Sequence, residues 1–381
     1  MILTLVIAFL SLIILMIVHE FGHFIIAKKF GVKVEEFGIG YPPKIFGKKF
    51  GETVYSINLI PLGAFVKIYG EEGLPAQAGG IDDYRSFSHL AIWKRILIVL
   101  GGVLAFWIAS IIIFSVVFGI GATIPVGDQD VVGIHNTRIE ITKVQSDSPA
   151  QIAGLKVGDQ LLKVSESAGA GSGTLTIDKI SDFQQFVKAH SSEQLDLLLE
   201  RGGQQMNVLI SPRVNPPEGQ GPTGVQLERI AEVIKKYPWY QAPWHGLLFT
   251  GEVTWQAIQG LYNVVASLFA GKGVPAGAEL AGPIGITIFL AKAADYGVGF
   301  FLYFIGSLSV LIALFNIFPI PALDGGKLVF LIIEKIKGKP VSANVEQVIT
   351  IVFFLLLISM SIFITIKFDF PRVVDFWKAG I

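Results

Sequence analysis

Four long apolar segments dominate the pattern of hydrophobic and polar positions along the chain. Each approaches the roughly 20 residues that an α-helix needs to cross a bilayer. They lie near residues 2–27, 96–120, 300–320 and 348–366. The first is too long for a signal peptide, has no basic start, and ends in Lys28 and Lys29 instead of a small-residue cleavage site. The pattern therefore predicts a polytopic α-helical membrane protein with about four transmembrane helices, the first of them retained.

Between the first two apolar segments, the spacing of hydrophobic residues is no longer that of a helix. Val54–Ile60 and Ala64–Ile68 are rich in β-prone residues and are separated by Pro61-Leu62-Gly63. Two such runs around a Pro-Gly turn predict a hairpin. Because a strand at membrane depth must keep its backbone groups paired, we expect this β-hairpin region to be membrane-associated and to lie beside the helices.

The only extended stretch without membrane character runs from residue 125 to residue 211. It contains short strand-like runs and one helical run, and a Pro- and Gly-rich linker at 212–224 follows it. The strand-like runs are 139–144, 160–164, 195–199 and 206–210, and the helical run lies near 181–190. This mixture predicts a small α+β domain inserted between the second and third spans.

The segment Ser148–Asp159 resembles the core of bacterial PDZ domains, with a short helix, a glycine turn and then a strand. The resemblance implies an extracytoplasmic PDZ domain that binds a peptide C-terminus by strand addition beside a helix. A longer loop, Ser165–Gly173, stands where such domains have a glycine turn. A β-rich spacer without a ligand of its own is the alternative interpretation.

The stretch Trp239–Ala270 is helix-prone and rich in aromatic residues, but polar residues interrupt it at Glu252, Gln256, Gln259 and Asn263. This mixture favours a helix at the outer membrane interface, and a fifth span is the alternative. The predicted organisation has four parts. They are an N-terminal membrane part at 1–120, the PDZ-like domain with its linker at 121–224, an interfacial helical region at 225–295 and a C-terminal membrane part at 296–381.

Basic residues gather in two of the connections between spans. Between the first two spans lie Lys28, Lys29, Lys33, Lys44, Lys48, Lys49, Lys67, Arg85, Lys94 and Arg95, and between the last two lie Lys327, Lys335, Lys337 and Lys339. The positive-inside rule therefore predicts that both connections are cytoplasmic and that both termini and 121–295 lie outside. The net charge of zero gives no indication of a nucleic-acid partner. The chain has no cysteine, which excludes disulfides and thiolate metal ligands.

The first apolar segment contains the sequence His19-Glu20-Phe21-Gly22-His23, which has the pattern His-Glu-x-x-His. On a helix, residues i and i+4 share a face, so both imidazoles can bind one zinc ion while the glutamate activates water. The alternative is a set of polar side chains that face a water-filled cavity or neighbouring helices. Such groups cost on the order of several kcal/mol at membrane depth, which favours a functional site. We predict that His19 and His23 are metal ligands and that Glu20 is the general base.

A catalytic zinc site needs a third protein ligand, for which Asp324 is the candidate. Asp324 follows Pro319 and Pro321, which break the helix at the end of the third span. Unwound backbone at membrane depth is tolerated where it lines a cavity or is buried in protein. His19 lies roughly 25 Å along the first helix, near the cytoplasmic edge of an apolar core about 30 Å thick. The third span brings Asp324 to the same edge, so the predicted topology joins both halves of the site.

Together these motifs resemble the site-2 protease family of intramembrane zinc metalloproteases, most closely the bacterial regulators of sigma-factor signalling. The resemblance is carried by the His-Glu-x-x-His helix, Phe37–Gly40, Ile60–Lys67, the PDZ-like insert, Ala281–Ile286 and Asn316–Gly326. It implies a Zn²⁺ enzyme of the bacterial inner membrane with its active site near the cytoplasmic side. Its expected substrates are single-pass membrane proteins, such as anti-sigma factors or signal-peptide remnants, cut in or near their transmembrane helices.

The resemblance also implies roles for residues that bind the substrate. Asn316, with Pro319 after it, would hold the substrate backbone near the metal, and an amide that packs helices is the alternative for Asn316. The hairpin, including Ile57 and Gly63, would offer a strand edge to an unwound substrate. Gly22 would keep room beside the metal or allow close helix packing. The second span departs from the family at Gly102–Phe106, where relatives often carry Gly-Pro and a polar asparagine.

Two functions of other classes are alternatives. A metal transporter would use the same ligands to pass an ion, but the chain shows no inverted repeat and no pair of broken helices. A catalytically idle scaffold would bind peptides through the PDZ-like domain. The intact Glu20 disfavours that scaffold, because an idle site needs no base between its ligands.

Overall fold

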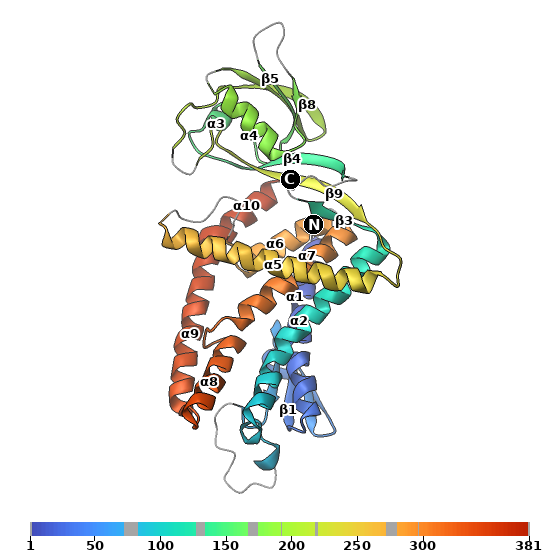
Figure 1. The fold of residues 1–381 in the computed structure, drawn as a ribbon, viewed down its shortest axis with the longest axis vertical. Coiled ribbons are helices and arrows are strands. Elements are labelled where there is room, and N and C mark those ends of the chain that lie inside the picture. The colour runs from blue at the N-terminus through green and yellow to red at the C-terminus, as the bar shows by residue number, and fades with distance from the viewer. Residues whose placement is uncertain are drawn as a thin grey trace. The chain divides into compact units, whose positions relative to one another are not determined.

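A computed structural model of the chain describes residues 2–71, 83–126, 134–166, 174–191, 193–217, 220–271, 280–295 and 297–379. They fall into two compact units, each described here by itself. The first takes its residues from 1–120, 237–273 and 279–381, and the second mainly from 121–236. The colours of Figure 1 follow the chain through both units.

Four helices of the described chain are long and apolar enough to cross a membrane. They are α1 (Ile2–Lys29), α2 (Ile92–Ile120), α7 (Val298–Ile317) and α9 (Ala343–Ile364), and α9 continues through a π-helical turn (Thr365–Asp369) into α10 (Phe370–Ala379). Their places confirm the four predicted apolar spans. In the last span, none of the 18 most apolar consecutive residues is buried within the protein. An apolar surface of that extent fits contact with lipid.

The helices α1, α2 and α7 share one apolar core with the short helix α6 (Pro283–Asp295). Leu15 of α1, Phe106 of α2, Leu308 of α7 and Leu290 of α6 are all buried in it. Small residues let the helices approach closely, because a Cβ on Gly306 of α7 would lie 2.9 Å from the Phe114 ring of α2. This core therefore fixes α7 against α2 and against α1, which carries the His-Glu-x-x-His sequence.

The helix α5 (Ala242–Phe269) is not among the four candidate spans of the described chain. In Figure 1 it runs across α2 and α7 instead of alongside them. Its buried residues include Gly246 and Thr250, and a Cβ on Gly246 would lie 2.8 Å from the Ile111 carbonyl oxygen of α2. Its exposed side chains include Trp244, Trp255 and Tyr262. The prediction of a helix here is confirmed.

The β-hairpin region folds differently from the prediction. β1 (Val34–Phe50) and β2 (Thr53–Ile68) are joined at Gly51 and Glu52. Part of each strand pairs with two separate parts of the other strand. Phe37 pairs with Tyr55 and also with Val66. The two runs that were predicted to pair with each other, 54–60 and 64–68, therefore lie on opposite sides of 36–39.

The predicted hairpin is wrong because the partner of both β-prone runs comes from an earlier part of the chain. Gly38 permits this arrangement, since a Cβ there would lie 2.3 Å from the Phe65 ring. The later part of β1 covers the far side of 53–58, where Lys48 pairs with Tyr55. Among the described residues, 64–68 pairs on one side only, so it is an edge of the sheet.

The second unit is built on an antiparallel sheet of seven described strands in the order β3-β9-β4-β5-β7-β8, with β6 beside β5. The strands are β3 (Ala122–Val126), β4 (Ile134–Val144), β5 (Gln160–Glu166), β6 (Leu175–Thr176), β7 (Leu195–Arg201), β8 (Gln204–Ile210) and β9 (Val225–Lys235). Its helices are α3 (Pro149–Ile152) and α4 (Ile180–Ala189). The four predicted strand-like runs and the predicted helical run are all present. Phe183 of α4 is buried with Leu161 and Leu197 of the sheet.

The short helix, glycine turn and strand predicted from Ser148 to Asp159 are also present. The Ser148 hydroxyl accepts a hydrogen bond of 3.1 Å from the Gln151 amide, which caps α3. Gly154 then takes a φ of +78°, a conformation that favours glycine. The loop Ser165–Gly173 lies largely outside the described residues.

The boundary of this unit differs from the sequence prediction. β9 pairs with both β3 and β4, so residues 225–235 complete the sheet instead of beginning a helical region. The second unit consequently ends at Lys236 and not at Gly224. Neither β3 nor β9 was predicted, because their partners lie far away in the sequence.

Candidate metal centre

The helices α1 and α2 cross at glycines. A Cβ on Gly22 would lie 2.2 Å from the Gly101 carbonyl oxygen, so any larger residue would push the two helices apart. Gly102 provides the room beside the imidazoles, because its Cβ would lie 2.3 Å from His23 Nε2 and 2.4 Å from His19 Cε1. Of the two roles expected for Gly22, the structure favours helix packing. The space for the histidines comes from a glycine on the opposite helix.

His23 is held in one orientation by the backbone of α2. Its Nδ1 lies 2.9 Å from the Ile98 carbonyl oxygen, which can only accept a hydrogen bond, so Nδ1 carries the proton. In the neutral imidazole, Nε2 is then the unprotonated nitrogen and has the lone pair that a metal needs. The ring of His19 stacks on Phe106, with 4.7 Å between the ring centroids. Both imidazoles are therefore positioned by α2.

Asp324 is the first residue of α8 (Asp324–Lys337), which follows the end of α7 after a short irregular segment. The segment turns tightly against α8. A Cβ on Gly325 would lie 2.1 Å from the Ile317 carbonyl oxygen, and one on Gly326 would lie 2.3 Å from the Ile320 carbonyl oxygen. The positive end of the helix dipole favours a carboxylate at the first position of α8. The glycine pair thus allows the turn that places Asp324.

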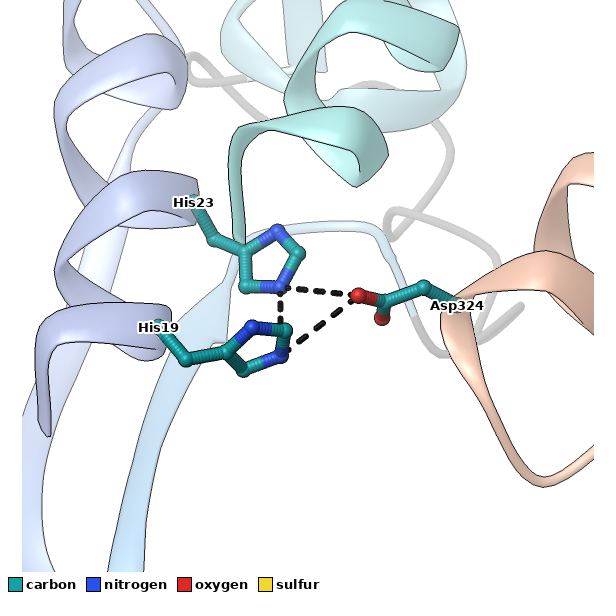
Figure 2. Close-up of side chains that lie close together, drawn as sticks. All are labelled: His19, His23 and Asp324. Carbon is teal, nitrogen blue, oxygen red and sulfur yellow. Dashed lines mark hydrogen bonds and ion pairs between the residues drawn. The ribbon is translucent and has the colours of Figure 1, made fainter. Parts of the chain in front are cut away.

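The three predicted ligands converge on one point, as Figure 2 shows. His19 Nε2 lies 3.3 Å from His23 Nε2, and Asp324 Oδ2 lies 3.4 and 3.5 Å from these two nitrogens. Ligand atoms about 2.0–2.1 Å from a tetrahedral zinc ion lie about 3.3 Å apart, so this triangle matches one face of such a site. Asp324 Oδ2 is buried and makes no hydrogen bond to the described residues. A metal ion would satisfy that oxygen, and the donor set fits zinc.

A cavity of about 560 Å³ opens beside these ligands. Glu20, His23 and Asp324 line it, together with Val66 at the edge of the β1–β2 sheet. The cavity is also lined by Glu71, Val99, Pro321, Ala322, Leu323, Lys327, Phe330, Ala343, Glu346, Gln347, Thr350 and Ile351. Glu20 therefore shares one space with two of the ligands, and that space is large enough for an extended peptide segment.

The remaining predicted residues do not line this cavity. Asn316 lies in the last turn of α7, and its side-chain amide donates a hydrogen bond of 3.2 Å to the Ile312 carbonyl oxygen. Pro319 is exposed in the segment between α7 and α8. The backbone of Ile57 pairs with both Ile39 and Phe46, although its side chain is exposed. Gly63 takes a φ of +136° and packs beside Met16 of α1.

A family model described as peptidase family M50 matches residues 7–360 of the chain. The chain belongs to peptidase family M50. Relatives over nearly the whole length bear the name zinc metalloprotease. One from Clostridium perfringens is 31% identical, covering 94% of this chain and 96% of the relative. One from Rickettsia conorii is 30% identical, covering 92% and 96%. RasP of Geobacillus kaustophilus is 27% identical, covering 91% and 93%.

This M50 peptidase is accordingly a zinc metalloprotease, and the resemblance to the site-2 protease family is confirmed at the level of the family. That result goes against both the transporter and the idle scaffold. Sequence reasoning gave no role in the site to Gly102, Ile98 or Val66, which shape the candidate site from the second helix and the sheet. Gly102 had been noted only as the start of a departure from the family pattern, and Val66 only as part of a β-prone run and of the family motif Ile60–Lys67.

Proposed function

We propose that this peptidase hydrolyses peptide bonds in or near the transmembrane helices of single-pass membrane proteins, such as anti-sigma factors or signal-peptide remnants. His19, His23 and Asp324 would hold the zinc ion, and Glu20 would act as the general base. The single observation that carries this proposal is the convergence of the three ligand atoms at 3.3–3.5 Å beside a cavity that Glu20 also lines.

The chemistry is divided between the cofactor and the chain. A zinc ion held by these ligands supplies Lewis acidity toward water and toward the scissile carbonyl group. Glu20 accepts the proton of the attacking water and later delivers it to the leaving amine. Phe106 and the Ile98 carbonyl group keep the two imidazoles in place during this transfer.

A substrate helix must unwind before its amides can react, and the edge run 64–68 offers a place for the unwound segment. Strand addition there would lay the peptide along a strand whose residue Val66 lines the cavity. Gly63 and Ile57 would bind the substrate from the sheet, Ile57 through its exposed side chain. Asn316 and Pro319 would contact the substrate backbone at the end of α7, as the family resemblance implies.

The proposed location is the bacterial inner membrane, with the lipid bilayer around four spans. Basic residues between α1 and α2 and between α7 and α9 favour a cytoplasmic position for these connections. Both ligand-bearing helix ends then face the cytoplasmic side. The exposed aromatic side chains of α5 favour a helix in the outer interface. The second unit would be extracytoplasmic.

The second unit would act as a PDZ domain. The capped helix α3, the turn at Gly154 and the strand β5 support this proposal. In this role it would bind a freshly cut peptide C-terminus or exclude substrates with bulky external domains. The peptidase would then make the second cut of a proteolytic cascade.

A reconstituted protein with a single-pass reporter substrate tests the proposal. Wild type and Glu252→Gln, which changes an exposed glutamate of α5, should bind zinc and cleave the reporter. Glu20→Gln should retain the zinc ion at this site but lose cleavage, and Asp324→Asn should lose both the zinc ion at this site and cleavage. Equal cleavage by all four proteins would overturn the assignment of these residues.

A further inference from the structure

A second group of side chains that can bind a metal lies in the second unit. Glu166, His190 and Glu193 each bring one ligand atom within 4.8 Å of the others. Glu166 ends β5, His190 follows α4, and Glu193 lies shortly before β7. Glu166 pairs with Leu195, the first residue of β7, so the sheet holds the end of β5 next to the turn that follows α4. The fold thus brings the end of β5 together with two residues of the turn between α4 and β7.

His190 is oriented in the way that a metal ligand requires. Its Nδ1 lies 2.8 Å from the Phe186 carbonyl oxygen and donates a hydrogen bond to it. The imidazole also stacks on the Phe186 ring, with 4.4 Å between centroids. A backbone hydrogen bond of this kind fixes the ring of a metal-binding histidine and leaves the other nitrogen for the ion. That nitrogen, Nε2, lies 2.9 Å from Glu166 Oε1.

An ion pair between Glu166 and His190 does not account for the second carboxylate, that of Glu193. The Glu193 backbone amide donates a hydrogen bond of 3.1 Å to the His190 carbonyl oxygen, which closes the turn and brings the Glu193 side chain to the same point. Glu193 is exposed, so its carboxylate can rotate onto an ion without disturbing the fold. The set offers one imidazole nitrogen and two carboxylate oxygens, with the solvent side open to water.

We propose that Glu166, His190 and Glu193 form a second metal site that binds a divalent transition-metal ion such as Zn²⁺. One imidazole with two carboxylates suits zinc and similar first-row ions, whereas calcium and magnesium take oxygen ligands only. The ion would bind His190 Nε2 and one oxygen of each carboxylate. It links the end of α4 to β5 and to the turn before β7. The three ligands come together only when the second unit is folded, and not in the unfolded chain. Binding of the ion therefore stabilises the folded second unit.

Metal counting on the full-length protein tests this site. The protein is purified in detergent without a polyhistidine tag, dialysed against buffered Zn²⁺, and its zinc content is measured by mass spectrometry. Wild type should hold two ions per chain, and Asp324→Asn should hold one. Glu193→Gln should weaken the second ion at least about tenfold, as expected for the loss of a ligand. Glu200→Gln on β7 is the matched control and should keep both ions.

Thermal unfolding in the Asp324→Asn background separates this site from the catalytic one. Zn²⁺ should raise the unfolding temperature of Asp324→Asn and of Asp324→Asn with Glu200→Gln, but not of Asp324→Asn with Glu193→Gln. If His190→Ala and Glu193→Gln bind as much zinc as wild type, with the same affinity, the second site does not exist. A zinc content that Asp324→Asn leaves unchanged would instead contradict the assignment of the first site.

Discussion

Arg95 of α2 and Glu334 of α8 form a bidentate ion pair inside the first unit. Arg95 Nη1 lies 2.9 Å from Glu334 Oε2, and Nη2 contacts Oε1. The side chains are only 10% and 16% exposed. Since α8 begins with Asp324 and α2 positions both imidazoles, this pair connects the two halves of the metal centre at a second point.

Removal of one partner of this ion pair should lower the free energy of unfolding. Arg95→Met leaves the Glu334 carboxylate buried without its partner, which destabilises proteins by about 3–5 kcal/mol. The double substitution Arg95→Met with Glu334→Leu should recover most of that loss, because a well-packed apolar pair often replaces a buried ion pair without penalty. Unfolding free energies in mixed micelles measure both effects. Equal destabilisation by the single and double substitutions would contradict this account.

Gly102→Ala should disrupt the metal centre. The added Cβ would meet His23 Nε2 at 2.3 Å, so the imidazoles must move away from Asp324. A displacement of about 1 Å at a catalytic group can cost about 100-fold in rate, and we expect at least that loss together with a reduced zinc content. Gly119→Ala on the same helix is the matched control, because its Cβ would come no closer than 3.9 Å to Ala242. Reporter cleavage and metal analysis compare the two variants, and normal zinc content in Gly102→Ala would speak against the packing argument.

Acid should destabilise the first unit through Glu52. The Arg85 guanidinium and then the Lys28 ammonium hold the pKa of Glu52 at about 2, below its ordinary value of 4.5. The ionised form is therefore favoured in the folded state. The stabilisation from Glu52 is fully present above pH 4.5 and is lost as the pH falls from 4.5 toward 2.

The unfolding temperature of wild type should consequently fall over that range of pH. Glu52→Gln should lower the unfolding temperature at neutral pH and show a smaller fall in acid. Measurement of both proteins by differential scanning fluorimetry gives the comparison. Parallel curves for the two proteins would show that other carboxylates cause the acid effect.

Metal removal should affect both activity and stability through the first site. In a His190→Ala background, a chelator should abolish reporter cleavage and lower the unfolding temperature, and added Zn²⁺ should restore both. A ligand present at 100 times its Kd stabilises the folded state by about 2.7 kcal/mol. The same treatment of His190→Ala with Asp324→Asn should change nothing. A chelator effect on that double variant would point to a different zinc ligand set.

The sequence was sufficient where the signals are local. The spans follow from apolar length, and His19 with His23 follows from helical spacing. Asp324 followed from a helix break whose depth matched that of the histidines, and the structure brings all three side chains together.

The sheet pairings and the space around the ligands could not be predicted in this way. Runs 54–60 and 64–68 have β propensity, but nothing in either run shows that 36–39 lies between them. Gly102 is an ordinary small residue in a span until the helix crossing is known. β9 mixes apolar and charged residues without a strict alternation, and its partners β3 and β4 lie about a hundred residues earlier. Contacts between distant parts of the chain decided each of these features.

The order of the three candidate ligands along the chain would also govern when the enzyme can act. α1 and α2 emerge first from the ribosome and can pack through Gly22 and Gly101 with both imidazoles in place. Asp324 is made only after the whole second unit and α7 have been synthesised. A nascent chain inserted only as far as α2 therefore carries an open pair of histidines and no complete protease. Translation itself would delay the activity until α7 and the start of α8 have been synthesised.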